Sequence, residues 1–122
     1  MSTDKEVRDE YADLVIGVTT DNGLRPIQDA TVTVIYSGPP GSGEKASMTL
    51  MTDENGRCGP FSMYTRRARI GGKYVNFPRF AKCDVEIRAD GFVPITARRL
   101  PIFPGITVNR SFDLISVKKG KA

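Results

Sequence analysis

The sequence contains no histidine and two cysteines among its 122 residues, and no apolar run is long enough to span a membrane. Without histidine, the chain lacks the commonest general base, the Ser-His and Cys-His catalytic couples and the usual zinc ligand sets. Cys58 and Cys83 are too few for a disulfide framework and lack metal-ligand spacing, so two reduced, partly buried thiols are expected, with a single bridge as the alternative. These absences disfavour an enzyme, and we predict no catalytic residue, metal site or cofactor.

The amino terminus also lacks the features of a signal peptide, because residues 1–11 are charged and acidic where a signal would be basic and then apolar. We therefore expect synthesis in the cytoplasm without a signal peptide, and no insertion into a membrane. Lysis, a dedicated secretion machine and assembly onto a particle are other routes out of the cell. A virion, a tail-like particle or a cell-surface assembly therefore stays open as the final location.

What the sequence does contain is a series of short runs in which apolar and polar residues alternate. This period of two is typical of half-buried β-strands. The central run is Arg25–Tyr36, where a turn-forming segment leads into a strongly alternating strand, and a second turn follows at Thr52–Gly56. Strands are expected within residues 14–18, 32–36, 48–50, 61–63, 83–89, 93–97 and 106–114.

A chain of 122 residues and 13.4 kDa is long enough to bury one core without metals or disulfides. Together with its Gly and Pro punctuation, the pattern predicts an all-β fold, a single antiparallel Greek-key β-sandwich of about seven strands. The expected organisation is a flexible acidic arm over residues 1–11, the sandwich over 12–116 and a basic tail over 117–122.

Two positions do not fit simple alternation. Pro94 cannot donate to a strand ladder, so its strand is expected to lie at a sheet edge or to contain a bulge. Arg110 has the same parity as the apolar residues of the last strand. Either a bulge precedes this arginine or its side chain emerges at the end of the sheet.

The order of four motifs resembles the carboxypeptidase regulatory-like domain. These motifs are Gly17-Val18, the segment 26–32, the turn Thr52–Gly56 and the segment 85–92. The ending, residues 97–115, is similar to the version found in bacterial envelope, spore and prophage-associated proteins. The resemblance covers about residues 12–116 and implies a prealbumin-like (CnaB-like) sandwich and a non-catalytic module for binding, spacing or assembly. Such domains are usually appendages of longer chains, whereas here the domain is nearly the whole chain, which implies a partner molecule or another copy.

Charge is distributed unevenly along the chain. The first 29 residues hold seven acids against three bases, while residues 55–83 hold seven bases and no acid. Opposite fields steer complementary surfaces together, which favours docking of the acidic arm of one copy or partner onto a basic loop of another. Binding of an anionic polymer is the first alternative, and a merely soluble charged surface is the second.

Residues 64–79 form the longest segment without a clear strand pattern, and a loop of this length is usually functional or flexible. We predict that its contact residues are Arg66, Arg67, Arg69, Lys73, Tyr74 and Arg79, with the acidic arm and Lys118, Lys119 and Lys121 as secondary contacts. The favoured function is a non-catalytic structural or adhesion-type module that mediates protein–protein assembly or self-association in a bacterial surface, filament or phage-like particle.

Two alternative functions use the same loop. In the first, Tyr64 and Tyr74 stack on the sugar rings of a cell-wall glycan. In the second, the basic loop 64–82 binds nucleic acid, which a net charge of +4 and the absence of the usual motifs disfavour. Exposed tyrosines in a concave patch would favour glycan, whereas an apolar or strand-edge surface near Pro94 would favour assembly.

Other candidate chemistry has simpler explanations. Asp84 and Glu86 share the wet face of one strand, where a solvated face is expected rather than an acid and base pair. Residues 53–55 offer clustered oxygens for calcium but also suit a β-turn. The glycine-rich segment 38–43 lacks the context of a phosphate loop and is expected to be an exposed hairpin tip.

Overall fold

The computed structural model describes residues 11–36, 45–65, 69–70, 73–74 and 81–117. These residues form ten strands and no helix: β1 (Tyr11–Thr20), β2 (Arg25–Pro26), β3 (Thr31–Tyr36), β4 (Ala46–Met51), β5 (Arg57–Tyr64), β6 (Arg69–Ile70), β7 (Lys73–Tyr74), β8 (Ala81–Arg88), β9 (Ile95–Ile102) and β10 (Thr107–Leu114). Within these ranges, nothing forms a helix of the length and hydropathy needed to cross a membrane.

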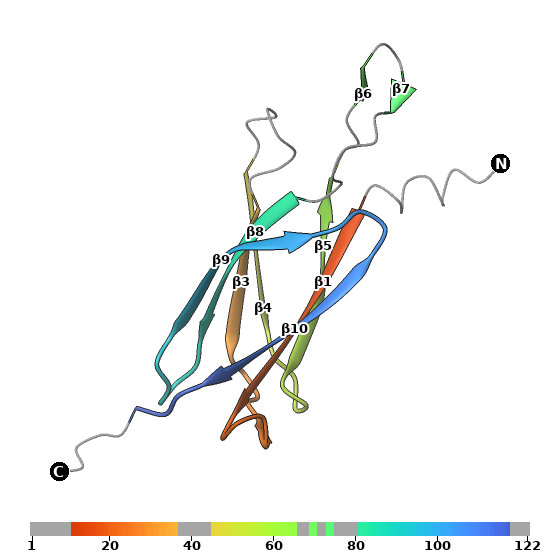
Figure 1. Ribbon diagram of the computed structural model, residues 1–122. Helices are drawn as coiled ribbons and strands as arrows, with labels where there is room; N and C mark the ends of the chain where they lie inside the picture. The colour runs from red at the N-terminus through yellow and green to blue at the C-terminus, as the bar shows by residue number, and fades with distance from the viewer. Residues whose placement is uncertain (1–10, 37–44, 66–68, 71–72, 75–80, 118–122) are drawn as a thin grey trace.

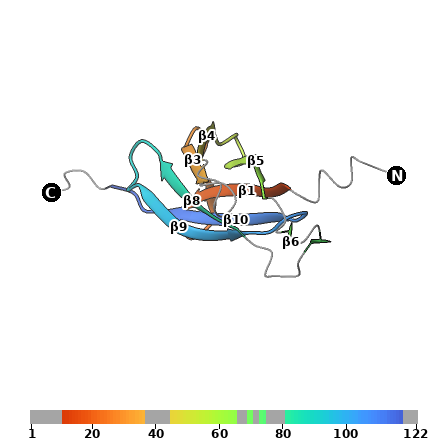
Figure 2. The same ribbon diagram turned by 90° about the horizontal axis from the view of Figure 1, so that it is seen from above.

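The strands form a sandwich of two main sheets (Figure 1). In the first sheet, β1 lies between β10 and β5, and the short β2 also pairs with β1. The second sheet has the order β4-β3-β8-β9 and is antiparallel throughout. Figure 2 shows β9 and β10 on one side of the sandwich and β4 and β5 on the other. The predicted all-β sandwich is confirmed, and each of the seven predicted strands is present.

Alternation in the sequence produces the core directly. Every second residue of β1, β3 and β8 faces the space between the sheets, and the apolar side chains there are almost completely buried. Among the largest of these side chains are Leu14, Ile16 and Ile87, with Phe61 and Met63 contributed by β5. This burial supplies the main driving force for folding of a single domain of this size.

The two turns around which the sequence is organised are joined in the structure. Thr52 is buried, and its hydroxyl donates to the carbonyl of Ile27 at 2.6 Å and accepts from the Ala30 amide at 2.9 Å. Two backbone hydrogen bonds run beside it, from Thr52 N to the Ala30 carbonyl and from Asp29 N to the Thr52 carbonyl. The start of β3 and the end of β4 are therefore fixed together by one threonine.

The turn at residues 21–23 is also held by a distant residue. Asp21, Asn22 and Gly23 all adopt positive φ, as expected for a turn of these residue types. The Asp113 carboxylate on β10 accepts from Gly23 N at 2.9 Å, from Asn22 N at 3.1 Å and from the Thr19 hydroxyl at 3.0 Å. These hydrogen bonds, with the backbone bond to Gly23 the largest contribution, hold the pKa of Asp113 below its ordinary value of 3.8.

Stability should therefore depend on Asp113 in a defined pH range. Because its folded-state pKa is depressed, the carboxylate stabilises the fold above about pH 4 and loses this effect as the pH falls through the folded-state value. We expect Asp113→Asn to be less stable than the wild type at pH 7, with the difference shrinking as the pH falls below about 4. Urea unfolding followed by circular dichroism between pH 2.5 and 7 measures this difference. A difference that stays constant over the whole range would contradict the assignment.

The pairing of the first and last strands departs from an entirely antiparallel sandwich. β10 runs parallel to β1, in continuous register from Asp13–Thr107 to Thr20–Leu114. The reason is the preceding turn: after β9, Phe103-Pro104-Gly105 carries the chain across to the other sheet, where Gly105 N donates to the Tyr11 carbonyl at 2.8 Å. The chain reverses its direction after β9 but also moves to the other sheet, so β10 lies beside β1 and runs parallel to it.

Pro94 lies just before β9, which is an edge strand, as predicted. The bulge in this strand lies elsewhere: Arg98 and Arg99 together oppose Asp84 of β8, where the register shifts between Cys83 and Val85. Arg99 has a φ of 60°, and its amide donates to the Asp84 carboxylate at 3.0 Å. A β-bulge with one residue in the left-handed region explains this geometry.

Candidate interaction surface

The structure describes little of the predicted contact loop. Arg66, Arg67 and Arg79 lie outside the described residues, as do residues 1–10 of the acidic arm, the glycine-rich segment 38–43 and the tail from residue 118. Tyr11, the last residue of the predicted arm, is instead the first residue of β1. Arg69, Lys73 and Tyr74 belong to β6 and β7, which pair as a separate two-stranded hairpin with Arg69 opposite Tyr74. The segment expected to lack strands therefore contains a short hairpin, and the role of the loop stays a prediction.

Two of the carboxylates considered for chemistry, Asp53 and Asp84, accept hydrogen bonds from backbone amides. The Asp53 carboxylate accepts from Asn55 N at 2.9 Å and from Arg57 N at 3.0 Å, which confirms the turn and lowers the pKa of Asp53. Asp84 and Glu86 alternate with inward residues of β8, as expected for an outer face. Across the described ranges, no group of three or more His, Cys, Asp or Glu residues is arranged to hold a metal ion.

Both cysteines are free and buried, as predicted. Cys58 belongs to β5 in the first sheet and Cys83 to β8 in the second. Burial raises the pKa of each thiol to about 11, with Asp53 adding to the effect at Cys58 and Asp84 at Cys83. Both thiols are therefore protonated at neutral pH and are weak nucleophiles.

An apolar surface lies at the end of the sandwich near Pro94. Val93, Ile115 and Val117 are 45%, 70% and 47% exposed, and we call these three residues the end patch. They are neighbours because Val93 N donates to the Ile115 carbonyl at 2.8 Å and Val117 N donates to the Gly91 carbonyl at 2.9 Å. Three exposed apolar side chains on a hydrogen-bonded pair of segments form a surface that another protein can cover.

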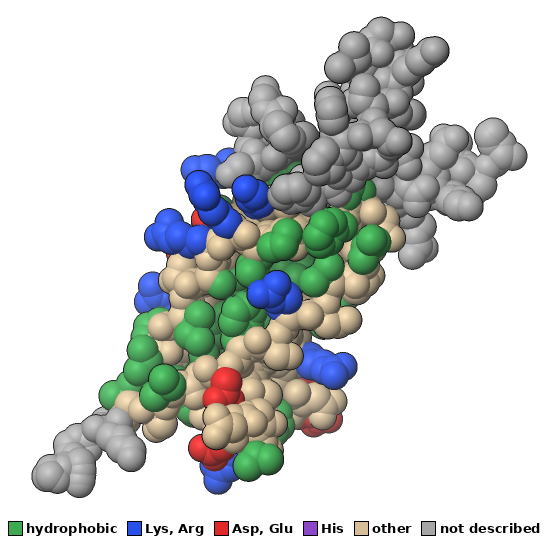
Figure 3. All heavy atoms as spheres, viewed as in Figure 1, with side chains coloured by type: hydrophobic (Ala, Val, Ile, Leu, Met, Phe, Trp, Pro, Cys, Tyr) green, Lys and Arg blue, Asp and Glu red, His purple; other side chains and the backbone are tan. Residues whose placement is uncertain are grey.

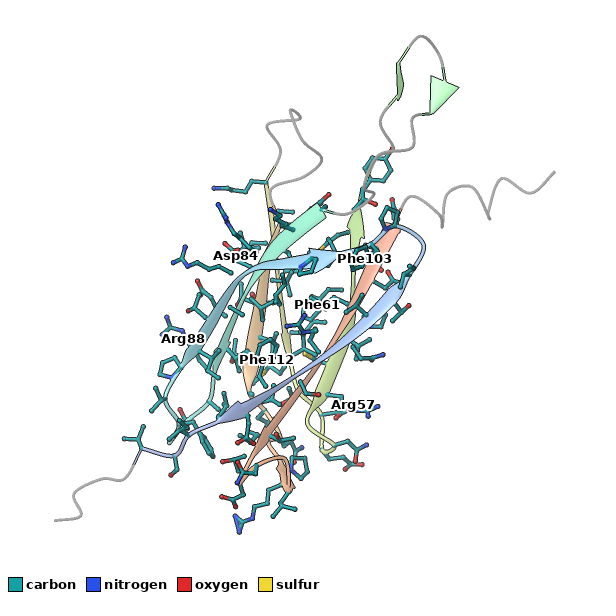
Figure 4. The ribbon with its side chains drawn as sticks, in the orientation of Figure 1. Arg57, Phe61, Asp84, Arg88, Phe103 and Phe112 are labelled. Atoms are coloured by element: carbon teal, nitrogen blue, oxygen red, sulfur yellow. The ribbon has the colours of Figure 1, made fainter. Side chains whose placement is uncertain are left out.

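The apolar surface continues from the end patch along the side of the molecule where β9 and β10 run. Inner-face residues of β1 and β3 are fully buried, but Ile95 and Ala97 of β9 and Val108 and Phe112 of β10 are only partly buried against the core. Figure 4 shows Phe112 pointing from β10 into the space between the sheets. We call this partly exposed apolar strip between the two edge strands the seam.

Arg110 lies in the middle of the seam. The register of β10 with β1 continues without a shift through Arg110, which is opposite the fully buried Ile16. Both sequence-based expectations for Arg110 are therefore wrong: no bulge precedes it and it is not at the end of the sheet. The unbroken register makes it face inward, and the edge position of β10 allows this because a long side chain on the inner face there still reaches water.

The surroundings of Arg110 are apolar. Val108 and Phe112 flank it on the same face of β10, and the guanidinium is close enough to Cys83 to act against the rise in the pKa of that thiol. Within the described part of the chain, no carboxylate forms an ion pair with Arg110. Figure 3 views the molecule from this side and shows a band of apolar side chains with a basic side chain within it.

Tyr64 is the one tyrosine of the proposed glycan site whose side chain is described. Its ring packs edge-on against Tyr11 with the ring centroids 5.4 Å apart, and 37% of the residue stays exposed. The Tyr36 hydroxyl donates to the Tyr64 carbonyl at 2.7 Å, which fixes the end of β5.

No family model matches this chain, and no curated protein matches it. Among solved structures, the chain is similar to 3-chlorocatechol 1,2-dioxygenase from Rhodococcus opacus, with a TM-score of 0.56 and 15% identity, over 88% of this chain and 60% of that one. It is also similar to a variant of catechol 1,2-dioxygenase from Acinetobacter radioresistens, with a TM-score of 0.55 and 15% identity, over 95% of this chain and 56% of that one. The chain thus spans at most about 60% of these enzymes, and the likeness shows the fold alone.

Proposed function

We propose that this protein is a non-catalytic β-sandwich module of protein assembly, in which the end patch packs against another protein chain. The observation that carries the proposal is the exposed apolar surface of Val93, Ile115 and Val117 beside Pro94. A surface of this kind favours a protein partner over a sugar or a nucleic acid, since both of those require polar or aromatic contacts. A role in a bacterial surface, filament or phage-like particle, and membership of the carboxypeptidase regulatory-like family, are parts of this proposal.

Two features support the non-catalytic part. The chain contains no histidine, and its two thiols are protonated at neutral pH because burial raises their pKa to about 11. Asp53 and Asp113, the carboxylates with lowered pKa values, each accept backbone hydrogen bonds at turns, which is a structural role. The 15% identity to the two dioxygenases carries no activity to this chain.

A double variant tests the end patch. Replacing Val93 and Ile115 by serine removes two exposed apolar side chains and should abolish an apolar contact while leaving the core intact, since both side chains point to solvent. We expect light scattering of the full chain to show a mass above 13.4 kDa that falls to 13.4 kDa in the double variant. An apolar contact also predicts little change in mass at high salt, whereas docking of the acidic arm predicts dissociation.

Met51→Ser is the matched control, because Met51 is 57% exposed on β4, on the opposite side of the sandwich from β9 and β10 (Figure 2). If the wild type is a monomer, the same three proteins serve as baits in a lysate of the source cells. We expect a partner on the wild type and on Met51→Ser but not on the double variant. If the wild type is a monomer and captures no more protein from the lysate than the double variant does, the proposal is wrong.

The alternatives have less support from the described residues. For glycan binding, the aromatic side chains described at the predicted site are Tyr64 and, behind it, Tyr11. For nucleic acid, the basic residues of the loop 64–82 would supply the phosphate contacts, and Lys82 is the one whose side chain is described. Both alternatives therefore depend on the loop and not on the surface that the sandwich presents.

A further inference from the structure

The two sheets of the sandwich are unequal in width at the seam. The second sheet has four strands, while the first has three long strands with β10 at its edge. The first sheet therefore covers the inner face of β9 incompletely, and Ile95 and Ala97 stay partly exposed. The position beside β10 is where one more strand would equalise the sheets and cover these side chains.

The edge of β10 is available for such a strand. In the described residues, β10 pairs with β1 on one side and with no strand on the other. An edge strand presents free amide and carbonyl groups to an added chain, and extended peptides commonly bind to sheets in this way. The inner face of an added strand would meet the apolar residues of the seam.

Arg110 defines the chemistry of the added strand. A guanidinium among apolar side chains loses hydration, and covering the seam would remove more water from it. A carboxylate on the incoming strand would compensate, because it pairs with a guanidinium in a bidentate geometry. The partner residue that faces Arg110 is therefore aspartate or glutamate, with apolar neighbours two residues away on each side to meet Val108 and Phe112.

A second copy of this sandwich does not meet the requirement through its own edge strands. The inner-face residues of β10 are Val108, Arg110, Phe112 and Leu114, and those of β9 are apolar, so neither edge supplies a carboxylate to the seam. The other two long edge strands, β4 and β5, contain no aspartate or glutamate. Pairing two β10 edges would instead place two arginines in one seam. Charge complementarity therefore selects a different segment as the occupant.

We infer that the seam between β9 and β10 binds an extended, apolar segment of a partner protein that adds a strand to β10 and pairs a carboxylate with Arg110. This inference rests on the proposed assembly function and names the partner segment for it. The seam and the end patch adjoin but share no residue, so different substitutions test them.

The probe is a phage-displayed library of random 12-residue peptides, selected against the full chain and against Arg110→Met and Arg110→Glu. We expect the wild type to enrich peptides with an acidic residue between β-branched or aromatic residues. Arg110→Met, which keeps a long side chain without the charge, should bind these peptides about 10- to 100-fold more weakly, the range for losing a hydrogen bond to a charged group. Arg110→Glu should enrich lysine or arginine at the same place.

Amide hydrogen exchange then locates the selected peptide. Strand addition predicts new protection of amides within residues 107–114, and little change in β4 on the opposite side of the sandwich. Selection of the same peptides by the wild type and Arg110→Met, no enrichment on the wild type, or no new protection of β10 would each overturn the inference. If a synthetic peptide of residues 1–11 displaced the selected peptides from the seam, the acidic arm of another copy would be the occupant, and the assignment to a partner protein would be overturned.

The Val93→Ser, Ile115→Ser double variant separates this inference from the proposed function. We expect it to lose its assembly partner but still to bind the acidic peptides, because its seam is unchanged. Assembly that depends on the end patch, together with no peptide preference at Arg110, would overturn the inference and leave the proposed function in place. Peptide binding that depends on Arg110, together with assembly that does not depend on the end patch, would overturn the proposed role of the end patch and leave the inference on the seam in place.

Discussion

Replacing Gly56 by alanine is expected to lower the free energy of unfolding by about 3–4 kcal/mol. Of this loss, about 1–2 kcal/mol comes from placing an alanine in the left-handed backbone region, and the remainder from the steric clash of its Cβ atom. Gly56 has a φ of +76°, and a Cβ atom there would lie 2.5 Å from the Val18 carbonyl oxygen. That oxygen cannot retreat, because it accepts from Ile27 N at 3.0 Å, while Val18 N donates to the Gly56 carbonyl at 2.7 Å. Urea unfolding followed by circular dichroism measures the loss.

Gly91→Ala is the control for the backbone part of this effect. Gly91 has a similar φ of +85°, but a Cβ atom there would meet nothing within 4 Å. Its cost should therefore be about 1–2 kcal/mol, that of an alanine in the left-handed region. Equal losses in the two variants would show that the contact between Gly56 and β1 is not tight.

Replacing Thr52 by valine is expected to cost about 2–4 kcal/mol, because two buried backbone groups would lose their partner at a cost of about 1–3 kcal/mol each. Valine matches threonine in shape but cannot accept from Ala30 N or donate to the Ile27 carbonyl. For a domain of this length, such a loss corresponds to a fall in melting temperature of roughly 10 °C, at about 4 °C per kcal/mol. Differential scanning calorimetry measures it.

Two substitutions calibrate the Thr52 result. Thr52→Ser keeps the hydroxyl and should lose about 1 kcal/mol or less, the value of the missing methyl group. Thr49→Val removes an exposed hydroxyl that bonds Thr33 at 3.0 Å and should stay within about 0.5 kcal/mol of the wild type. If Thr52→Val were as stable as Thr49→Val, the joint between the two turns would not depend on the buried hydroxyl.

Gly56 and Thr52 belong to the same short turn, and both act on β1 or on the start of β3. Thr52 holds the segment from Ile27 to Ala30, and Gly56 lets the turn approach Val18. The importance of the Thr52–Gly56 motif was visible in the sequence as a turn that follows an alternating strand. Its partners were not visible, because a hydrogen bond to Ile27 joins residues 25 positions apart.

The candidate site was less predictable than the fold. Charge density and the lack of a strand pattern directed attention to the loop 64–79, since solvated basic residues leave a clear signal in a sequence. The end patch leaves almost none, because isolated residues such as Val93 and Ile115 look like ordinary strand residues until their neighbours are known. Arg110 did leave a signal, because it is a charged residue at a position where the alternation of the last strand expects an apolar one. The two explanations drawn from the sequence were wrong.

By itself, the sequence determined the all-β class, the seven long strands, their inward residues and most turns, because a period of two and the backbone preferences of Gly, Asn, Asp and Pro are local properties. Pro94 also indicated that β9 is an edge strand. Only the tertiary structure decided that β10 is an edge, that it runs parallel to β1, and that Arg110 faces a seam. Those outcomes depend on which sheet each strand joins, and that choice is made by contacts between residues far apart in the chain. The seam between β9 and β10 results from that choice, through the unequal widths of the two sheets.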